Sequence, residues 1–96
     1  MFVIVSYDIP NDKRRTQVMK TLKDYGAHVQ YSVFECELKP ELYRRLQEQL
    51  QEIINAEEDN IRFYVLSQED VKKRRVWGQE RTEVELRSFY LVGKRP

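Results

Sequence analysis

The sequence has few of the residues that indicate a disulfide-rich, fibrous or membrane-spanning protein. It has one cysteine, Cys36, among 96 residues, which excludes an internal disulfide and a cysteine-rich zinc site. Three glycines and three prolines are too few for a fibrous or disordered chain. The longest apolar run, Phe2–Val5, is far too short for a membrane span or a signal peptide. We therefore expect a soluble, cytoplasmic protein that does not bind a membrane.

Several catalytic signatures are also missing. The sequence has no glycine-rich phosphate loop, no paired histidines, no zinc spacing, and no serine or cysteine with a nearby base. A lone histidine such as His28 is more often a surface or strand residue than a catalyst. Cys36 lies in an apolar pattern and is most simply a core residue.

The residues that are present suffice for one small domain. Hydrophobic residues make up 41% of the chain and aromatic residues 11%, enough for a two-layer core. Apolar periodicity predicts strands over 2–8, 27–38, 61–66, 71–77 and 88–92, with helices beginning near residues 12 and 40. The predicted fold class is α+β: a single ferredoxin-like βαββαβ domain over 1–96, with an additional C-terminal strand and two helices on one face of an antiparallel sheet.

Local signals mark the ends of these elements. Asn11 or Asp12 is a suitable N-cap for the first helix, and Pro40 suits the first turn of the second. Gly26 is expected to end the first helix in a left-handed conformation. In 27–38 the apolar positions change from odd to even, which indicates a bulge or a strand that moves to another sheet face.

Two predicted strands carry apolar side chains on both faces of the sheet, and the two helices can cover only one face. Residues 2–8 and 61–66 carry apolar side chains on both faces, whereas the helices cover one. An uncovered apolar face of this size is an association surface, so we predict a two-fold homodimer with the sheets facing each other. The alternative is that residues 71–96 fold back over that face within one chain.

Charge is distributed unevenly along the chain. Residues 1–34 have a net charge of +2, residues 35–70 of −6 and residues 71–96 of +5. This polarity predicts a face that attracts phosphate, although charge runs are also typical of solvated helix and loop faces. The candidate nucleic-acid-binding residues are Lys13, Arg14, Arg15, Lys72, Lys73, Arg74 and Arg75.

Asp8 is the candidate metal ligand and catalytic residue. A carboxylate that closes a buried apolar strand is in an unusual place for a charge, and Mg²⁺ needs only one or two carboxylates beside its waters. A two-fold axis near this strand end would supply a second Asp8. The competing interpretation is a local turn with Pro10 and Asn11. Ser32 either binds phosphate or points at solvent.

Three segments resemble a known family. YDIPNDKRR (7–15), YG (25–26) and VQYSVFEC (29–36) closely resemble the small CRISPR-associated adaptation nuclease, the ferredoxin-like partner of the CRISPR integrase. The resemblance implies a homodimer, Mg²⁺-dependent cleavage of RNA or double-stranded DNA, and a role in spacer acquisition with that integrase. It places the metal-binding aspartate at Asp8, and neighbouring motif positions at Tyr7, Arg15, Ser32 and Phe34.

The resemblance leaves two function classes open. In the first, the chain is a nuclease in which Asp8 holds Mg²⁺ and Tyr7 and Phe34 line the cleft. In the second, it is a non-catalytic dimeric scaffold that binds DNA and the integrase, because nuclease activity is dispensable for integration in some members. His28 and Gln17 stand where some members have arginine, which removes positive charge near the site.

Overall fold

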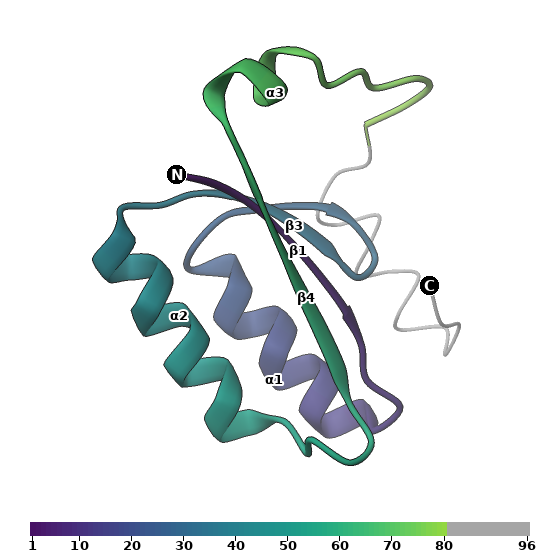
Figure 1. Ribbon diagram of the computed structural model, residues 1–96. Helices are drawn as coiled ribbons and strands as arrows, with labels where there is room; N and C mark the ends of the chain where they lie inside the picture. Colours follow the sequence, from purple (N-terminus) through teal and green to yellow (C-terminus); the bar gives the residue numbers. More distant parts are fainter. Residues whose placement is uncertain (81–96) are drawn as a thin grey trace.

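A four-stranded antiparallel sheet with two helices packed on one face forms the body of the protein (Figure 1). The computed structural model describes residues 1–80. Its elements are β1 (Phe2–Asp8), α1 (Asp12–Lys23), β2 (Ala27–Gln30), β3 (Val33–Glu37), α2 (Pro40–Ile53), β4 (Asn60–Leu66) and α3 (Gln68–Lys72). The sheet order is β2-β3-β1-β4, so β1 is a central strand and β4 lies at one edge. The predicted α+β fold is confirmed; the strand predicted over 88–92 lies outside the described residues.

The core lies between the sheet and the two long helices. Side chains alternate between the faces of a strand, and the odd-numbered residues of β1 point toward the helices, where they are buried. Together with the apolar faces of α1 and α2 they form one cluster, which includes Val3, Val5, Tyr7, Val18, Leu22, Phe34, Cys36, Leu46 and Leu50. This packing fixes β1 and therefore the position at which Asp8 leaves the sheet.

Both long helices begin where the sequence predicts. Asn11 is the N-cap of α1, and its side-chain oxygen accepts a hydrogen bond from the backbone N–H of Arg14 at 2.9 Å. Pro40 occupies the first turn of α2, where its missing N–H costs nothing. The start of α1 is thereby fixed four residues after Asp8.

The segment 27–38 forms a hairpin and not one continuous strand. β2 and β3 pair antiparallel around a turn at Tyr31 and Ser32, and the register shifts between His28 and Gln30. The change of phase in the sequence has two sources, the turn and this irregularity. The predicted bulge is therefore confirmed, whereas the interpretation of one strand is wrong, and Ser32 lies in the turn.

Gly26 is required for space and not for a left-handed backbone. Among the described glycines only Gly78 has a positive φ. A Cβ on Gly26 would collide with Sγ of Cys36 and with the carbonyl oxygen of Glu35. The expected left-handed helix end is therefore wrong: Asp24, the C-cap of α1, has ordinary helical geometry, and the glycine lets the chain pass close to β3.

The strand predicted over 71–77 is absent, and α3 occupies its first residues. Ser67 caps this short helix, with its side-chain oxygen accepting from the N–H of Asp70 at 3.1 Å. Glu69 and Asp70 in the first turn and Lys72 in the last suit the helix dipole. The capping residues outweigh the weak strand pattern around Val71.

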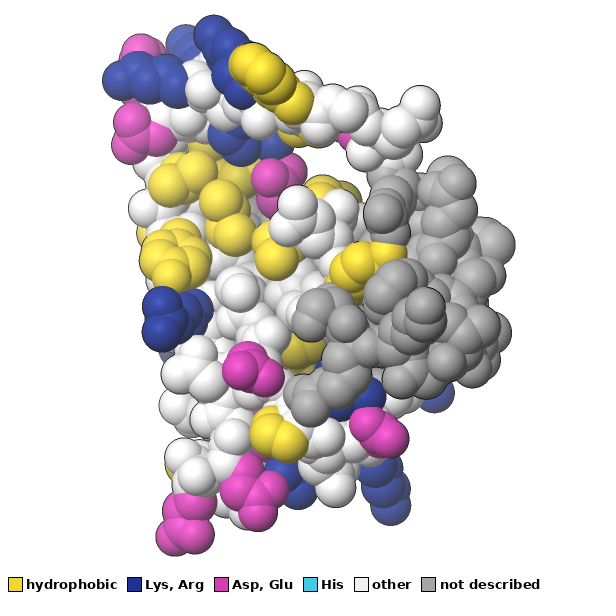
Figure 2. Space-filling view, turned by 90° about the vertical axis from the view of Figure 1, so that its right-hand side faces the viewer, with side chains coloured by type: hydrophobic (Ala, Val, Ile, Leu, Met, Phe, Trp, Pro, Cys, Tyr) yellow, Lys and Arg dark blue, Asp and Glu magenta, His cyan; other side chains and the backbone are white. Residues whose placement is uncertain are grey.

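The sheet face opposite the helices carries apolar side chains. Ile4 lies opposite Tyr64, and Phe2 opposite Leu66, on β1 and β4. Figure 2 views the molecule from this side and shows hydrophobic side chains gathered toward β4. Tyr64 is 47% exposed, so part of this face is open to a partner. The face-to-face homodimer stays a prediction.

The chain after α3 passes over one end of the same face. The guanidinium of Arg74 lies 4.7 Å from the ring centroid of Phe2 and pairs with Glu35 at 2.6 Å. This covers the Phe2 end of the sheet in the way that the alternative to the dimer required, while residues 81–96 lie outside the described part. None of the three helices within 1–80 combines the length and apolarity of a membrane crossing.

Candidate functional site

The C-terminal end of β1 brings together three polar residues from separate segments. Asp8 is exposed and lies opposite Asn60, the first residue of β4. On the other side of β1, the N–H of Tyr7 donates to the carbonyl oxygen of Ser32 at 3.1 Å, which places the β2–β3 turn next to Asp8. Residues at the same end of neighbouring strands are within side-chain reach of one another. The β2–β3 turn and Asn60 thus flank the end of β1 at Asp8, and a shared site of Asp8 and Ser32 stays a prediction.

Arg15 holds the loop that follows Asp8. Its Nη1 donates to the carbonyl oxygens of Ile9 and Pro10, at 2.9 and 3.4 Å, and its Nη2 pairs with Asp12. The side chain is only 12% exposed. These bonds engage the guanidinium with the β1–α1 loop, and nucleic-acid binding by Arg15 stays a prediction.

Arg14 is engaged with the acidic loop before β4. Its Nε donates to Oδ2 of Asp59 at 2.8 Å, and its Nη2 donates to Oδ1 of Asp59 and to Glu58 at 3.2 and 2.9 Å. The Asp59 side chain has no exposed surface and also accepts the N–H of Asn55 at 2.9 Å. The Arg14 hydrogen bonds, followed by the Asn55 N–H, lower the pKa of Asp59 against the opposing effect of burial.

Tyr7 and Phe34 are core residues. Tyr7 is 4% exposed and Phe34 fully buried, with their rings stacked at 6.5 Å. The hydroxyl of Tyr7 donates to the carbonyl oxygen of Tyr31 at 3.2 Å, which ties the β2–β3 turn to β1. Both rings face the helices and present no surface in one chain, so cleft lining by Tyr7 and Phe34 stays a prediction. They support the site from beneath.

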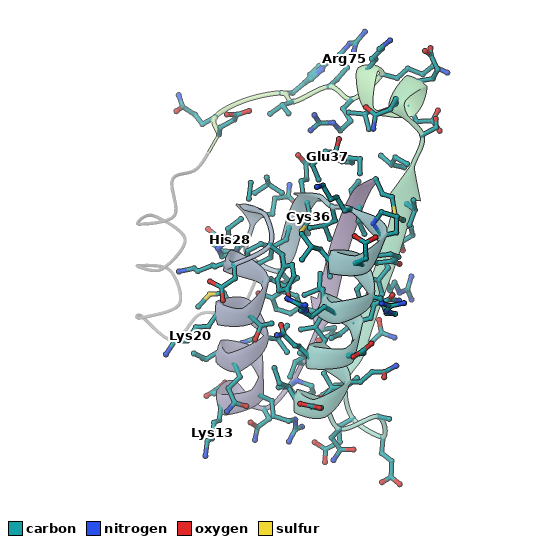
Figure 3. All side chains as sticks on the ribbon, turned by 90° about the vertical axis from the view of Figure 1, so that its left-hand side faces the viewer. Lys13, Lys20, His28, Cys36, Glu37 and Arg75 are labelled. Carbon is teal, nitrogen blue, oxygen red and sulfur yellow. The ribbon has the colours of Figure 1, made fainter. Side chains whose placement is uncertain are left out.

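The two predicted basic groups lie at opposite ends of the molecule. Figure 3 shows Lys13 at one end, at the start of α1, and Arg75 at the other. Asp8 is at the Lys13 end, because Arg74 lies over Phe2, the first residue of β1. Within one chain the two groups therefore do not form one continuous patch beside Asp8.

The charges of the basic groups are partnered to different extents. Lys72 and Lys73 lie within 3.5 and 3.8 Å of Glu69 and Asp70, and these contacts are exposed. Arg75 donates to two backbone carbonyls of its own segment. Lys13 is exposed at the start of α1 and makes no hydrogen bond or ion pair with any residue of 1–80 (Figure 3).

The donor set at the end of β1 fits a hard cation only in part. Residues 1–80 contain no group of three or more His, Cys, Asp or Glu side chains that would hold a metal ion. The Asp8 carboxylate is an oxygen donor of the kind that Mg²⁺ prefers, and Mg²⁺ retains several waters. The side-chain oxygen of Asn60 accepts a hydrogen bond from Nε of Arg62 at 3.3 Å. Among the paired residues of β1 and β4, Asp8 is the one carboxylate, and a site completed by a second subunit stays a prediction.

Two contributors to this end of the sheet were not predicted from the sequence. Asn60 gave no signal beyond its position before an apolar strand, and only the β1–β4 register places it opposite Asp8. Asp59 is 45 residues from Arg14, a separation that carries no spacing information. The capping pattern of Ser67 and Asp70, by contrast, was available in the sequence as a helix signal.

Known proteins resemble this chain over most of its length. The family model "CRISPR associated protein Cas2" matches residues 1–74. CRISPR-associated endoribonuclease Cas2 3 of Synechocystis sp. is 43% identical over 76 residues, covering 79% of this chain and 83% of that protein. CRISPR-associated endoribonuclease Cas2 3 of Chloroflexus aurantiacus is 47% identical over 78 residues, covering 81% and 84%.

Solved structures give the same result. The crystal structure of Streptococcus pyogenes Cas2 at pH 6.5 superposes with a TM-score of 0.73 at 36% identity, covering 81% of this chain and 100% of that one. A chain of a partial Cas6-RT-Cas1–Cas2 complex superposes with a TM-score of 0.71, also at 36% identity, covering 79% and 89%. From the family model, the sequence identities and the shared fold, this chain belongs to the Cas2 family.

Proposed function

We propose that the protein is a Mg²⁺-dependent endonuclease that hydrolyses phosphodiester bonds of RNA or double-stranded DNA in CRISPR spacer acquisition. The observation that carries the proposal is the exposed carboxylate of Asp8 at the end of a buried strand, beside Ser32 and Asn60. The relatives named CRISPR-associated endoribonuclease Cas2 support a nuclease.

A homodimer completes the site in this proposal. Asp8 of one subunit and Asp8 of the partner subunit would together hold the cation, because Asp8 is the one carboxylate among the paired residues of β1 and β4. The open apolar face of Ile4, Tyr64 and Leu66 is the surface through which two copies associate. When bound, a divalent cation supplies Lewis acidity toward the phosphate and acidifies a water.

The residues of the chain itself bind and orient the substrate. Lys13 attracts the phosphate backbone at the start of α1, and the Ser32 hydroxyl donates to a phosphate oxygen from the β2–β3 turn. Arg15 keeps the loop after Asp8 in one conformation through the carbonyls of Ile9 and Pro10. A fixed carboxylate costs less reorganisation in the transition state than a mobile one.

The direct test is cleavage of RNA and duplex DNA by wild type and Asp8→Asn, each with Mg²⁺ or EDTA. Asp24→Asn is the matched control, because it neutralises an exposed carboxylate at the far end of α1. We expect Mg²⁺-dependent cleavage by the wild type and the control, and a loss of about 100-fold or more for Asp8→Asn. Equal cleavage by wild type and Asp8→Asn would refute the assignment.

The second candidate function is a non-catalytic dimeric scaffold that binds DNA and the CRISPR integrase. It is favoured by the place of Lys72–Arg75, which lie at the opposite end of the sheet from Asp8. The solved Cas1–Cas2-containing complex supports the integrase as the partner. For this function we expect duplex binding that weakens with salt and survives both Asp8→Asn and EDTA. Binding that is unchanged when Lys72–Arg75 are neutralised would contradict it.

A further inference from the structure

Two adjacent arginines hold the two chain segments that border Asp8. Arg15 bonds to Ile9 and Pro10, which follow Asp8 directly. Arg14 bonds to Asp59, which precedes Asn60, the residue opposite Asp8. The first turn of α1 is therefore hydrogen-bonded to the loop that follows β1 and to the residue that precedes β4.

The charge around Arg14 does not suit a phosphate contact. Its guanidinium donates three hydrogen bonds to the carboxylates of Asp59 and Glu58. One cation between two anions leaves a local net charge of −1, which repels a polyanion. Freeing Arg14 for a phosphate would also leave the Asp59 carboxylate, whose side chain has no exposed surface, without its cation, which is unfavourable.

The bonds around Asp59 instead restrain the start of β4. The Asp59 carboxylate accepts from Arg14 and from the N–H of Asn55, and the N–H of Asp59 donates to the carbonyl oxygen of Asn55 at 2.8 Å. The loop from 55 to 59 is thus closed on itself and fastened to α1. Asn60 follows Asp59 without an intervening residue and is the first residue of β4, so this fastening lies directly beside the Asp8–Asn60 pair.

We propose that Arg14 is a positioning residue that acts through Asp59: the pair fixes Asn60 opposite Asp8 and so sets the place of the Asp8 carboxylate. The inference rests on the proposed nuclease function for its kinetic consequences. In this proposal Arg14 contacts other residues of the protein, whereas the sequence led us to expect a contact with phosphate.

The experiment compares Arg14→Gln, Asp59→Asn and the double variant with wild type. Arg44→Gln is the matched control, because Arg44 forms an exposed pair with Glu48 on α2, 3.8 Å apart. Each protein is characterised by kcat and KM for RNA cleavage with Mg²⁺, by the salt dependence of RNA binding, and by the amide NMR signals of Asp8 and Asn60. Arg14→Lys, which keeps the charge but not the two-point contact, replaces Arg14→Gln if the latter fails to fold.

A positioning role predicts that the two single variants behave alike. Each should lower kcat by about 10-fold with little change in KM, because a small displacement of a reacting group is costly. The double variant should be no worse than either single variant, because both remove the same interaction. The amide signals of Asp8 and Asn60 should shift in all three variants and not in Arg44→Gln.

A phosphate contact predicts a different pattern. Arg14→Gln alone would then raise KM and lower the slope of log affinity against log salt by about one, whereas Asp59→Asn would leave or improve binding. This difference between Arg14→Gln and Asp59→Asn would overturn the proposal. Amide signals of Asp8 and Asn60 that are unchanged in the variants would also overturn it. If the wild type cleaves neither RNA nor DNA, the proposed nuclease function fails, and the NMR signals alone decide on the Arg14–Asp59 clamp.

Discussion

The backbone N–H of Tyr7 donates to the carbonyl oxygen of Ser32 at 3.1 Å, one position beyond the Ser6–Val33 pair of β1 and β3. This bond places the β2–β3 turn beside Asp8 and uses only the backbone of Ser32. The Ser32 hydroxyl therefore takes no part in this hydrogen bond.

Ser32→Ala should separate substrate contact from folding. Because the backbone bond to Tyr7 survives the change, we expect a melting temperature within a few degrees of wild type, as is usual for substitutions away from structural features. RNA cleavage should fall by about 10-fold if the hydroxyl donates one hydrogen bond to phosphate. Thermal melts and initial rates measure the two effects. A large loss of stability at unchanged cleavage would show that the hydroxyl supports the fold.

Gly26→Ala should destabilise the protein through steric overlap. The added Cβ meets Sγ of Cys36 and the backbone oxygen of Glu35, and only the first can be removed by mutation. We expect a loss of about 1–3 kcal/mol in the free energy of unfolding, as for other overpacked sites. Urea titration measures it, with the exposed Thr16→Ala on α1 as control.

The double variant Gly26→Ala/Cys36→Ala tests the cause of that loss. Because the Glu35 carbonyl is backbone, the overlap with it remains after the sulfur is removed. The double variant should therefore stay less stable than Cys36→Ala alone. Equal stability of these two proteins would show that β3 moves aside at no cost.

Asp59 should make the protein sensitive to acid. Its folded pKa is lowered chiefly by the hydrogen bonds from Arg14, so the carboxylate contributes stability above its ordinary pKa of 3.8 and loses this contribution as pH falls through the folded value. The variant Asp59→Asn has no carboxylate at this position and therefore lacks this pH-dependent contribution to stability. We expect the wild type to be more stable than Asp59→Asn at pH 7 and the difference to shrink in strong acid. Melting curves across this range measure it, and a constant difference would contradict the assignment.

Cys36 should be unreactive in the folded protein. Burial, with a smaller effect of Glu35, raises the pKa of this thiol from 9.0 to about 11, so its thiolate fraction near neutral pH is about 100-fold lower than that of an ordinary cysteine. Reaction with a disulfide reagent at pH 8 should be slower in the native protein than in urea by at least that factor. Comparable rates would show that the core opens readily around β3.

Alkaline conditions give the complementary effect. Since the thiol ionises near its ordinary pKa in the unfolded chain but only near 11 in the folded one, the unfolded state loses its proton first. The wild type should thus lose stability relative to Cys36→Ala as pH rises from 9 to about 11.

Local patterns in the sequence predicted most of the fold, but they did not predict contacts between residues far apart in the sequence. The apolar strand before Asp8, the cap at Asn11 and the proline at the start of α2 depend on neighbouring residues, and the structure confirms each. The Arg14–Asp59 and Arg74–Glu35 pairs join residues 45 and 39 positions apart. Strand order and helix packing determine which residues pair, and the pattern of charges along the sequence gives no information about either.

The same distinction explains the errors at Gly26 and after β4. Gly26 follows a helix, which suggested a left-handed end, but the residue is small because β3 passes against it in space. The segment from Val71 has a weak strand pattern, but Ser67 and Asp70 satisfy the first turn of a helix. Tyr7 and Phe34 belong to the motif that revealed the family, and their burial shows that a motif position need not be a surface contact.

The most direct test of the nuclease account is the activity of a mixed dimer. Co-expression of wild-type and Asp8→Asn chains with two different affinity tags allows the heterodimer to be isolated and compared with both homodimers. If the cation is held by Asp8 from both subunits, the heterodimer should cleave RNA or duplex DNA with Mg²⁺ no better than the Asp8→Asn homodimer. A heterodimer with half of the wild-type rate would show that each Asp8 works alone, and would contradict the shared site.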